Sequence, residues 1–292
     1  GTAKQYTPAI VGADALVFAP TANYVNYSGM KNGLPIENSA QPDLGGSGYD
    51  PQSPWKDRDP RFYNDIVYDG VKVVQGTLAA NMETHRYANL FTSGSYRDER
   101  SGSRTGYMLY KFVPRTSNNF DQGWNYGQNL NIKVPYMRLA DIYLMYAESI
   151  AAGYESPSTK VDGFSKSGVD AINVIRDRAG VGHVAAKFIA SSTEFMKEVR
   201  RERAVELSFE GHRFNDLRRW RLLAEVPYTL KTAAEFDRAT PLNPTADSKM
   251  NRVVNYRERV ILQRQFSEKH YWLPLKRADV NMYPEFAQNP GW

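Results

Sequence analysis

The chain has 292 residues, of which 41% are hydrophobic and 24% charged, a composition typical of a soluble globular protein with an ample core. It contains no cysteine, which excludes disulfides, thiolate metal sites and a cysteine nucleophile. The net charge of +5 does not indicate nucleic-acid binding, because basic and acidic residues are interleaved and no Lys/Arg run exceeds two. No apolar run approaches the roughly 18 residues of a membrane span.

The first 60 residues are rich in Gly, Pro, Asn, Asp and Ser, which predicts loops and turns, with one short strand at residues 16–18. In the segment WKDRDPRF, Asp57, Asp59 and Arg61 are expected to form a local ion-pair cluster around Pro60. Calcium is the alternative occupant, although the oxygen spacing is not that of an EF-hand. Further on, the alternation of Ile66, Tyr68, Val71 and Val73 around Asp69-Gly70 predicts a β-hairpin.

Residues 84–131 carry many aromatic side chains among Ser, Gly, Asn, Arg and Asp, and no period of 2 or 3.6 organises most of them. Aromatic rings on polar loops are candidates for a surface on which a ligand stacks. The alternative is that some of these rings fasten the loops to the scaffold. Three of the rings and three neighbouring polar residues are the candidate ligand-binding set: Trp124, Tyr126, Tyr96, Asn125, Asn118 and Arg97.

Two helices are predicted next, at residues 135–152 with Pro135 first and at about 167–179 with Gly180 as the stop. Their size and their small residues resemble a tetratricopeptide-type helix pair. Residues 225–260 are predicted to be polar loop, with a short strand or turn at 260–266. The proline-containing tail is expected to be an extended strap.

The most informative stretch is residues 191–220. It predicts one helix from a capping box at Ser191 and Glu194 to Glu210, a break at Gly211, and a second helix from about Arg213 to Leu223. Four carboxylates at successive i+4 positions share a helix face with Phe195, Val199 and Phe209: Glu198, Glu202, Glu206 and Glu210. A face that carries phenylalanines is not fully solvated, so these carboxylates need cationic partners.

We therefore predict a structural Arg–Glu network that joins neighbouring helices. The arginines assigned to it are Arg203, Arg213, Arg218 and Arg176. Paired catalytic carboxylates are the alternative, but the many interleaved arginines favour the structural role.

The motifs of this chain resemble those of the SusD/RagB family. The block RRERAVELSFEGHRFNDLRRW is similar to the helix pair of that family, and VPYMRLADIYLMYAESIA, AINVIRDRAGV, NGLPIE, DPRF and the closing QNPGW resemble further family segments in the same order. The resemblance implies a mainly α fold with long irregular loops, a few short strands and tetratricopeptide-like helix pairs, as a fragment of an α-α superhelix. We expect a single C-terminal region of the family, divided into a loop-rich, ligand-binding part (1–134), a helical scaffold (135–224), and loops with a C-terminal strap (225–292).

Members of that family are lipoproteins of the outer membrane, exposed at the cell surface. The resemblance implies that the N-terminal half and the lipid-anchor segment are absent here, and that only such an anchor would attach the protein to the membrane. It also implies a role in polysaccharide utilisation, with oligosaccharide or polysaccharide as ligand and a SusC-like TonB-dependent transporter as partner.

The expected function is therefore non-catalytic binding of glycans for delivery to that transporter, with no cofactor. Sugars present C–H faces that stack on aromatic rings and hydroxyls that pair with Asn, Asp and Arg, which is why Trp124 is the leading candidate. The alternatives are a peptide- or protein-binding member of the family and a purely structural scaffold or lid. Glycoside hydrolysis is a further alternative, but the four histidines are scattered and no HExxH, GxSxG or phosphate-binding motif is present.

Overall fold

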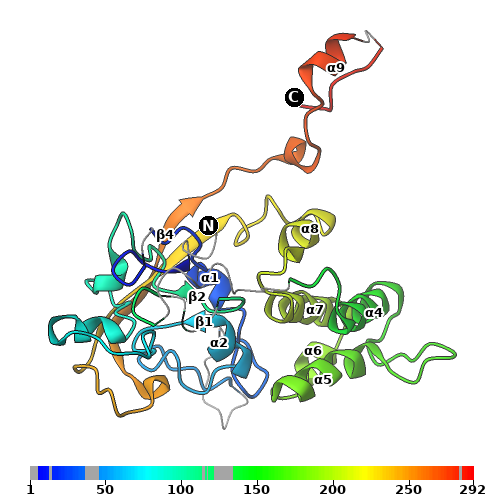
Figure 1. Ribbon diagram of the computed structural model, residues 1–292. Coiled ribbons are helices and arrows are strands. Elements are labelled where there is room, and N and C mark those ends of the chain that lie inside the picture. Colours follow the sequence, from blue (N-terminus) through cyan, green and yellow to red (C-terminus); the bar gives the residue numbers. More distant parts are fainter. Residues whose placement is uncertain are drawn as a thin grey trace.

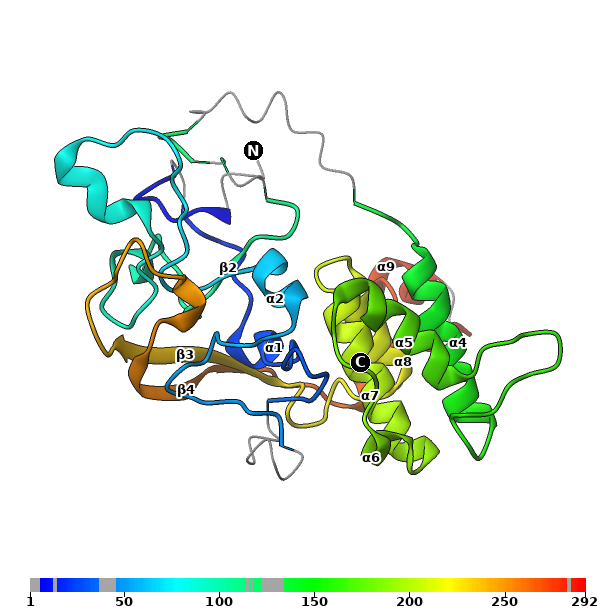
Figure 2. The same cartoon turned by 90° about the horizontal axis from the view of Figure 1, so that it is seen from below.

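The computed structural model describes residues 6–12, 15–36, 46–113, 116, 118–121, 134–282 and 285–292. Figures 1 and 2 show helices α4 to α8 gathered on one side, which we call the helical part. Helices α1 and α2 and two small antiparallel sheets lie on the other side, which we call the ribbon part. No helix among the described residues combines the length and the apolar character needed to cross a membrane.

The element bounds are α1 Ala22–Val25, α2 Pro60–Asp65, β1 Ile66–Val67, β2 Met108–Leu109, α4 Leu139–Gly153, α5 Gly168–Ala179, α6 Ala186–Ile189, α7 Ser192–Glu206, α8 His212–Arg219, β3 Leu230–Arg238, β4 Val253–Gln263 and α9 Arg277–Met282. Short 3-10 helices lie at Ala80–Arg86, Ser95–Arg97, Ser248–Met250 and Glu268–Tyr271. The prediction of a mainly helical chain with helix pairs, long loops and a few strands is confirmed.

Helix α5 has the expected bounds, with a reciprocal capping box between Ser167 and Asp170 and a left-handed Gly180 after its last turn. Helix α4 begins at Leu139 instead of Pro135, because Arg138 is extended and serves as its N-cap. Helices α4 and α5 pack together, and α4 also packs against α7. This arrangement is the helix pair that the sequence predicted.

Helix α7 ends at Glu206, four residues before the predicted Glu210. The backbone of Phe209 is left-handed (φ 60°), so the helix cannot continue through it, and its ring packs against Tyr24 with 5.4 Å between the centroids. At the N-terminus, Ser191 accepts the backbone N–H of Glu194. The side chain of Glu194 pairs with Lys197, so only one half of the predicted capping box is present.

Two strand predictions and one loop prediction are wrong. Residues 16–18 form no strand, and β1 pairs with β2 (Ile66 opposite Leu109) instead of turning at Asp69-Gly70 into a hairpin. Asp69 is buried and accepts the backbone N–H groups of Leu90 and Phe91, which fixes that turn to the following loop. Residues 225–260 are not loop throughout, because β3 and β4 form a long antiparallel ribbon.

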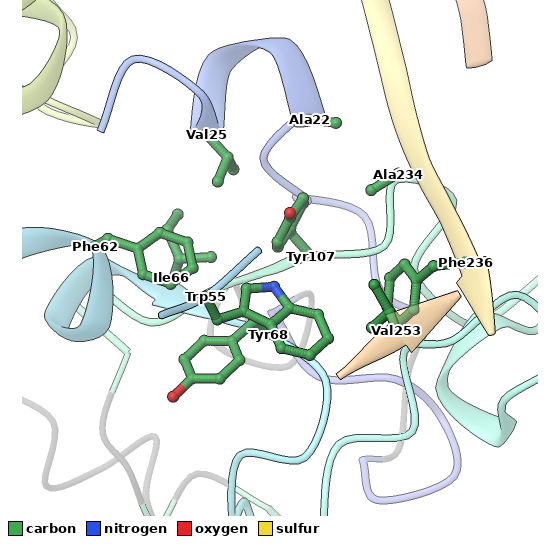
Figure 3. Packing of buried hydrophobic residues seen from close by; sticks show 10 residues of the cluster. All are labelled: Ala22, Val25, Trp55, Phe62, Ile66, Tyr68, Tyr107, Ala234, Phe236 and Val253. Carbon is green, nitrogen blue, oxygen red and sulfur yellow. The ribbon is translucent and has the colours of Figure 1, made fainter. Parts of the chain in front are cut away.

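The ribbon supplies one wall of the main core of the ribbon part (Figure 3). Trp55 stacks on Tyr68 at 5.3 Å between ring centroids and meets the edge of Phe236 from β3 at 5.4 Å. Ala22 and Val25 of α1 and Val253 of β4 complete the contacts. The core therefore joins residues from the first and the last third of the chain.

After β4 the chain leads away from the body and carries α9 at its far end (Figure 1). Tyr271 still packs against Leu217 and Leu223 near α8, and its backbone carbonyl accepts a hydrogen bond from the Arg218 guanidinium. Beyond that contact the side chains of Trp272 and Leu273 are largely exposed. The predicted strap is thus fastened to the body at Tyr271.

Candidate functional site

The acidic face of α7 is buried and is paired with cations from several segments. Glu198, Glu202 and Glu206 are only 2%, 1% and 4% exposed. Glu198 forms ion pairs with Arg176 of α5 and with Arg201, which is three residues further along α7. The predicted structural network is therefore present on the face where the i+4 spacing placed it.

Most partners of the other glutamates come from outside the predicted set, although Arg176 also pairs with Glu202 at 2.9 Å. Arg61 of α2 donates Nη1 to Glu202 at 2.6 Å and to Glu206 at 3.0 Å, and it also binds Asp59 at 2.7 Å. Arg138, the N-cap of α4, reaches Glu206 at 2.7 Å and Glu210 at 2.8 Å. Arg61 thus joins the ribbon part to α7, and Arg138 joins the start of α4 to the C-terminal end of α7.

Three arginines assigned to the network have different contacts. Arg203 bridges Asp141 at 2.8 Å and Asp216 at 3.0 Å, and so ties α4 to α8 without using a glutamate. Arg213 lies over the rings of Tyr27 and Tyr228, and Arg218 donates to the carbonyl of Tyr271. The assignment of Arg213 and Arg218 to Glu pairs is wrong, because α8 turns these side chains away from the acidic face.

Burial and charge act in opposite directions on these carboxyl groups. Burial alone would raise the pKa of Glu202, but the charges of Arg61, Arg176 and Arg201 outweigh it and hold the pKa at about 2. The pKa values of Glu198 and Glu210 are lowered for the same reason. These groups stay ionised at neutral pH and have no poised proton to exchange, which supports a structural role over an acid-base one.

The predicted ligand-binding residues fall into three groups. Trp124, Asn125 and Tyr126 lie outside the described residues. Tyr96 is fully buried and its hydroxyl donates to the carbonyl of His85, so its ring has no free face for a sugar. Asn118 is also buried, where its amide binds Asp121 and the carbonyl of Val73. For Tyr96 and Asn118 the prediction is wrong, because both hold the loops together.

Arg97 lies at the wall of a hollow of about 760 Å³ that also includes Arg104, Glu235 and Arg259. Its Nη1 donates to the carbonyls of Leu90 and Ala234 at 3.2 and 2.8 Å. Burial lowers the pKa of Arg97, with the charge of Glu235 acting in the opposite direction. Arg97 remains a candidate for ligand contact.

A second hollow, of about 520 Å³, lies between α1, α7 and the turn before β3, and we call it the α1–α7 cavity. It combines aromatic rings with amide and guanidinium groups, among them Asn23, Asn26, Tyr27, Phe188, Arg200 and Tyr228. Its size is within the roughly 300–1,000 Å³ of small-ligand sites. Sequence reasoning missed it, since its residues come from segments about 200 positions apart.

Two buried polar atoms in the wall of the α1–α7 cavity have no hydrogen-bond partner among the described residues. They are Oδ1 of Asn26, an acceptor, and Nε of Arg200, a donor. Unpaired buried polar atoms cost free energy until a partner is supplied. Both atoms are covered by protein, so they do not face the open space of the cavity.

Within the described part of the chain, no group of three or more His, Asp or Glu side chains is arranged to hold a metal ion. In the WKDRDPRF segment, where calcium was the alternative, both carboxylate oxygens of Asp59 accept hydrogen bonds from the Arg61 guanidinium. Arg61 and Asp59 therefore form the expected ion pair beside Pro60.

Comparison with known proteins identifies the family. The model of the SusD family matches residues 5–292. The chain belongs to the SusD family. Comparison with curated proteins gives no significant match.

The fold is similar to those of solved SusD-like proteins. One, a SusD-like protein from Bacteroides fragilis, has a TM-score of 0.64 and 22% identity, and the match covers 94% of this chain and 46% of that one. Another, a SusD-like carbohydrate-binding protein from the same species, has a TM-score of 0.56 and 23% identity, with 90% of this chain and 47% of that one covered. The chain thus spans about half the length of these relatives.

The structure explains why the SusD segments occur together. Arg61 of DPRF lies between Glu202 and Glu206, and Arg176 of the AINVIRDRAG segment lies between Glu198 and Glu202. Arg201 donates to the carbonyl of Gly33 in NGLPIE. Gly33 in turn lies so close to Gly182 that an added Cβ would be 2.4 Å from the Gly182 carbonyl oxygen. The segments are separate in sequence but share one set of contacts around α7.

Replacing Glu206 by Gln should lower the free energy of unfolding by about 3 kcal/mol, because it removes the charge that Arg61, Arg138 and Arg178 share. Urea denaturation followed by circular dichroism measures this change. As a control, Glu194→Gln removes an exposed pair with Lys197 and should leave the midpoint unchanged. Equal midpoints for wild type and Glu206→Gln would contradict the structural role, as would loss of ligand affinity in a normally folded variant.

Stability should fall as the pH is lowered from about 4.5 to about 2. The folded-state pKa of Glu202 is below its ordinary value, so its contribution is complete above pH 4.5 and is lost as the pH falls through about 2. Asp65 has the opposite effect on stability. Burial raises its pKa, so the folded state takes up this proton more readily than the unfolded state as the pH falls. Urea midpoints at pH 7, 4 and 3 test this, and Glu202→Gln should flatten the dependence. A variant with the same acid dependence as wild type would show that Glu202 is not responsible.

Proposed function

We propose that this chain is a non-catalytic glycan-binding protein of the cell surface, which passes oligosaccharides to a TonB-dependent transporter in the outer membrane. The observation that carries the proposal is the match to the SusD family over residues 5–292. A protein of similar fold from Bacteroides fragilis is described as carbohydrate-binding, which supports the choice of ligand class. In the full-length protein, a lipid anchor at the N-terminus would attach it to the membrane.

The α1–α7 cavity supports this proposal physically. The rings of Tyr27 and Tyr228 line it and are both covered on one side by Arg213, whose guanidinium lies 4.8 and 5.6 Å from the two ring centroids. Amphipathic rings next to amide groups match a saccharide, which has apolar C–H faces and hydroxyl edges. The amide and guanidinium groups that line the cavity are the hydrogen-bonding groups we assign to sugar hydroxyls.

Trp124, Asn125, Tyr126 and Arg97 form the second part of the proposed contact set.

A glycan array probed with this chain and with the full-length mature protein tests the proposal. Binding of the same glycans by both would place a sufficient site in this chain. Binding only by the full-length protein would mean that this chain contributes scaffold or part of a site. If neither bound any glycan but both retained peptides from a peptide array, the peptide-binding alternative would replace the proposal.

Single substitutions then separate the two parts of the contact set. We expect Tyr228→Ala and Trp124→Ala each to weaken binding of the best glycan about tenfold, measured by isothermal titration calorimetry, since each removes a stacking ring. Tyr136→Ala is the matched control, because that ring is fully exposed and lies outside the cavities described above. Unchanged affinity in the Trp124 variant would remove that residue from the site, and unchanged affinity in the Tyr228 variant would remove the α1–α7 cavity.

A further inference from the structure

A third hollow, of about 410 Å³, lies where α1, α8 and the ribbon meet, and we call it the α8 cavity. Three cationic side chains line it, and among the described residues no carboxylate does. Its cationic and aromatic lining consists of Arg213, Lys231, Arg264, Tyr24, Phe209 and Phe214. The α8 cavity therefore has a strongly positive wall beside apolar rings.

The ribbon itself brings two of the cations together. Lys231 is on β3 opposite Leu262 of β4, and Arg264 follows β4, with its backbone N–H donating to the carbonyl of Thr229 at 2.9 Å. Burial, followed by the charges of Arg264 and Arg213, lowers the pKa of Lys231 to about 8. Like charges this close repel one another, and an anion between them would remove the repulsion.

Two carboxylates close to the cavity wall already have partners. Asp65 and Asp216 are close enough to influence the Tyr24 hydroxyl at the cavity wall. The carboxylate of Asp65 accepts a hydrogen bond from the Ser208 hydroxyl at 2.8 Å and lies 3.8 Å from the Lys111 ammonium. The carboxylate of Asp216 forms ion pairs with Arg203 at 3.0 Å and Arg219 at 2.9 Å. Neither carboxylate is available to neutralise Lys231.

The α8 cavity adjoins the α1–α7 cavity. Arg213 lines both, and the rings of Tyr24 and Tyr27, one in each wall, are 5.7 Å apart. Phe214 is 51% exposed at the α8 cavity and offers an open apolar face. One saccharide chain can therefore place neighbouring units in the two cavities.

We propose that the α8 cavity is a subsite for the anionic group of an acidic oligosaccharide, a carboxylate or sulfate bound by Lys231, Arg213 and Arg264. The proposal rests on the proposed function and names its substrate class. An anion among these three cations would make charge-assisted hydrogen bonds and remove their mutual repulsion, while Phe214 would contact the sugar ring.

The test uses matched pairs of saccharides with and without the charge. The probes are uronate-containing oligosaccharides and their carboxyl-reduced forms, together with sulfated oligosaccharides and their desulfated forms. In calorimetric titrations, the wild-type chain and the full-length protein should prefer the acidic member of at least one pair about tenfold. In the Lys231→Gln and Arg264→Gln variants, the ratio of the two affinities should fall toward one. The control variant Lys72→Gln, which changes an exposed lysine elsewhere, should retain the preference.

The outcomes separate the two proposals. Neutral saccharides bound as tightly as acidic ones, or a preference that both variants retain, would overturn the subsite but not glycan binding. No binding of any saccharide would overturn the proposed function and the subsite with it. Inorganic sulfate that binds at the same residues as tightly as the best oligosaccharide would reassign the site to a free anion.

A stability measurement distinguishes ligand binding from a structural role for Lys231. If the lysine is retained for binding, Lys231→Gln should raise the melting temperature of the ligand-free protein at pH 7, because it removes a half-buried charge that is repelled by Arg213 and Arg264. A lower melting temperature would show that Lys231 stabilises the fold, and would count against the subsite.

Discussion

The contact on which most of this structure depends is the Arg61 guanidinium between Glu202 and Glu206 of α7. A buried carboxylate is tolerated only when its charge is matched. Three glutamates on one helix face and a fourth just beyond its end therefore require cations from neighbouring segments, and this requirement fixes those segments relative to α7. The network joins the ribbon part, through Arg61 and Lys111, to the helical part, through Arg138 and Arg176.

Because the acidic face of α7 is occupied, the surfaces available for a ligand lie at its margins. The α1–α7 cavity and the α8 cavity both open beside α1, where the ribbon part meets helices α7 and α8. Arg213, which the sequence assigned to the ion-pair network, instead lines both cavities and covers the rings of Tyr27 and Tyr228. Paired charges thus form the scaffold, whereas the three cations that line the α8 cavity have no ion pair with a carboxylate among the described residues.

The sequence was least informative about the ribbon. β3 and β4 carry many charged and polar residues because only part of the ribbon is buried, and their register shifts twice, which breaks the alternation of period 2. The polar composition of these residues therefore indicated loop. The contacts that stabilise the ribbon, among them Trp55 with Phe236, are formed between residues far apart in the chain.

By itself, the sequence determined the mainly helical class, the acidic face of α7, its need for arginine partners, and the α5 helix with its stop at Gly180. These features are local, because spacing of 3 or 4 residues and capping side chains act within one or two turns. Only the tertiary structure decided which cations pair with which glutamates and that Tyr96 and Asn118 are buried. It also decided that residues from α1, α7, α8 and the ribbon enclose common cavities. Such contacts join segments up to about 200 residues apart, and no local period records them.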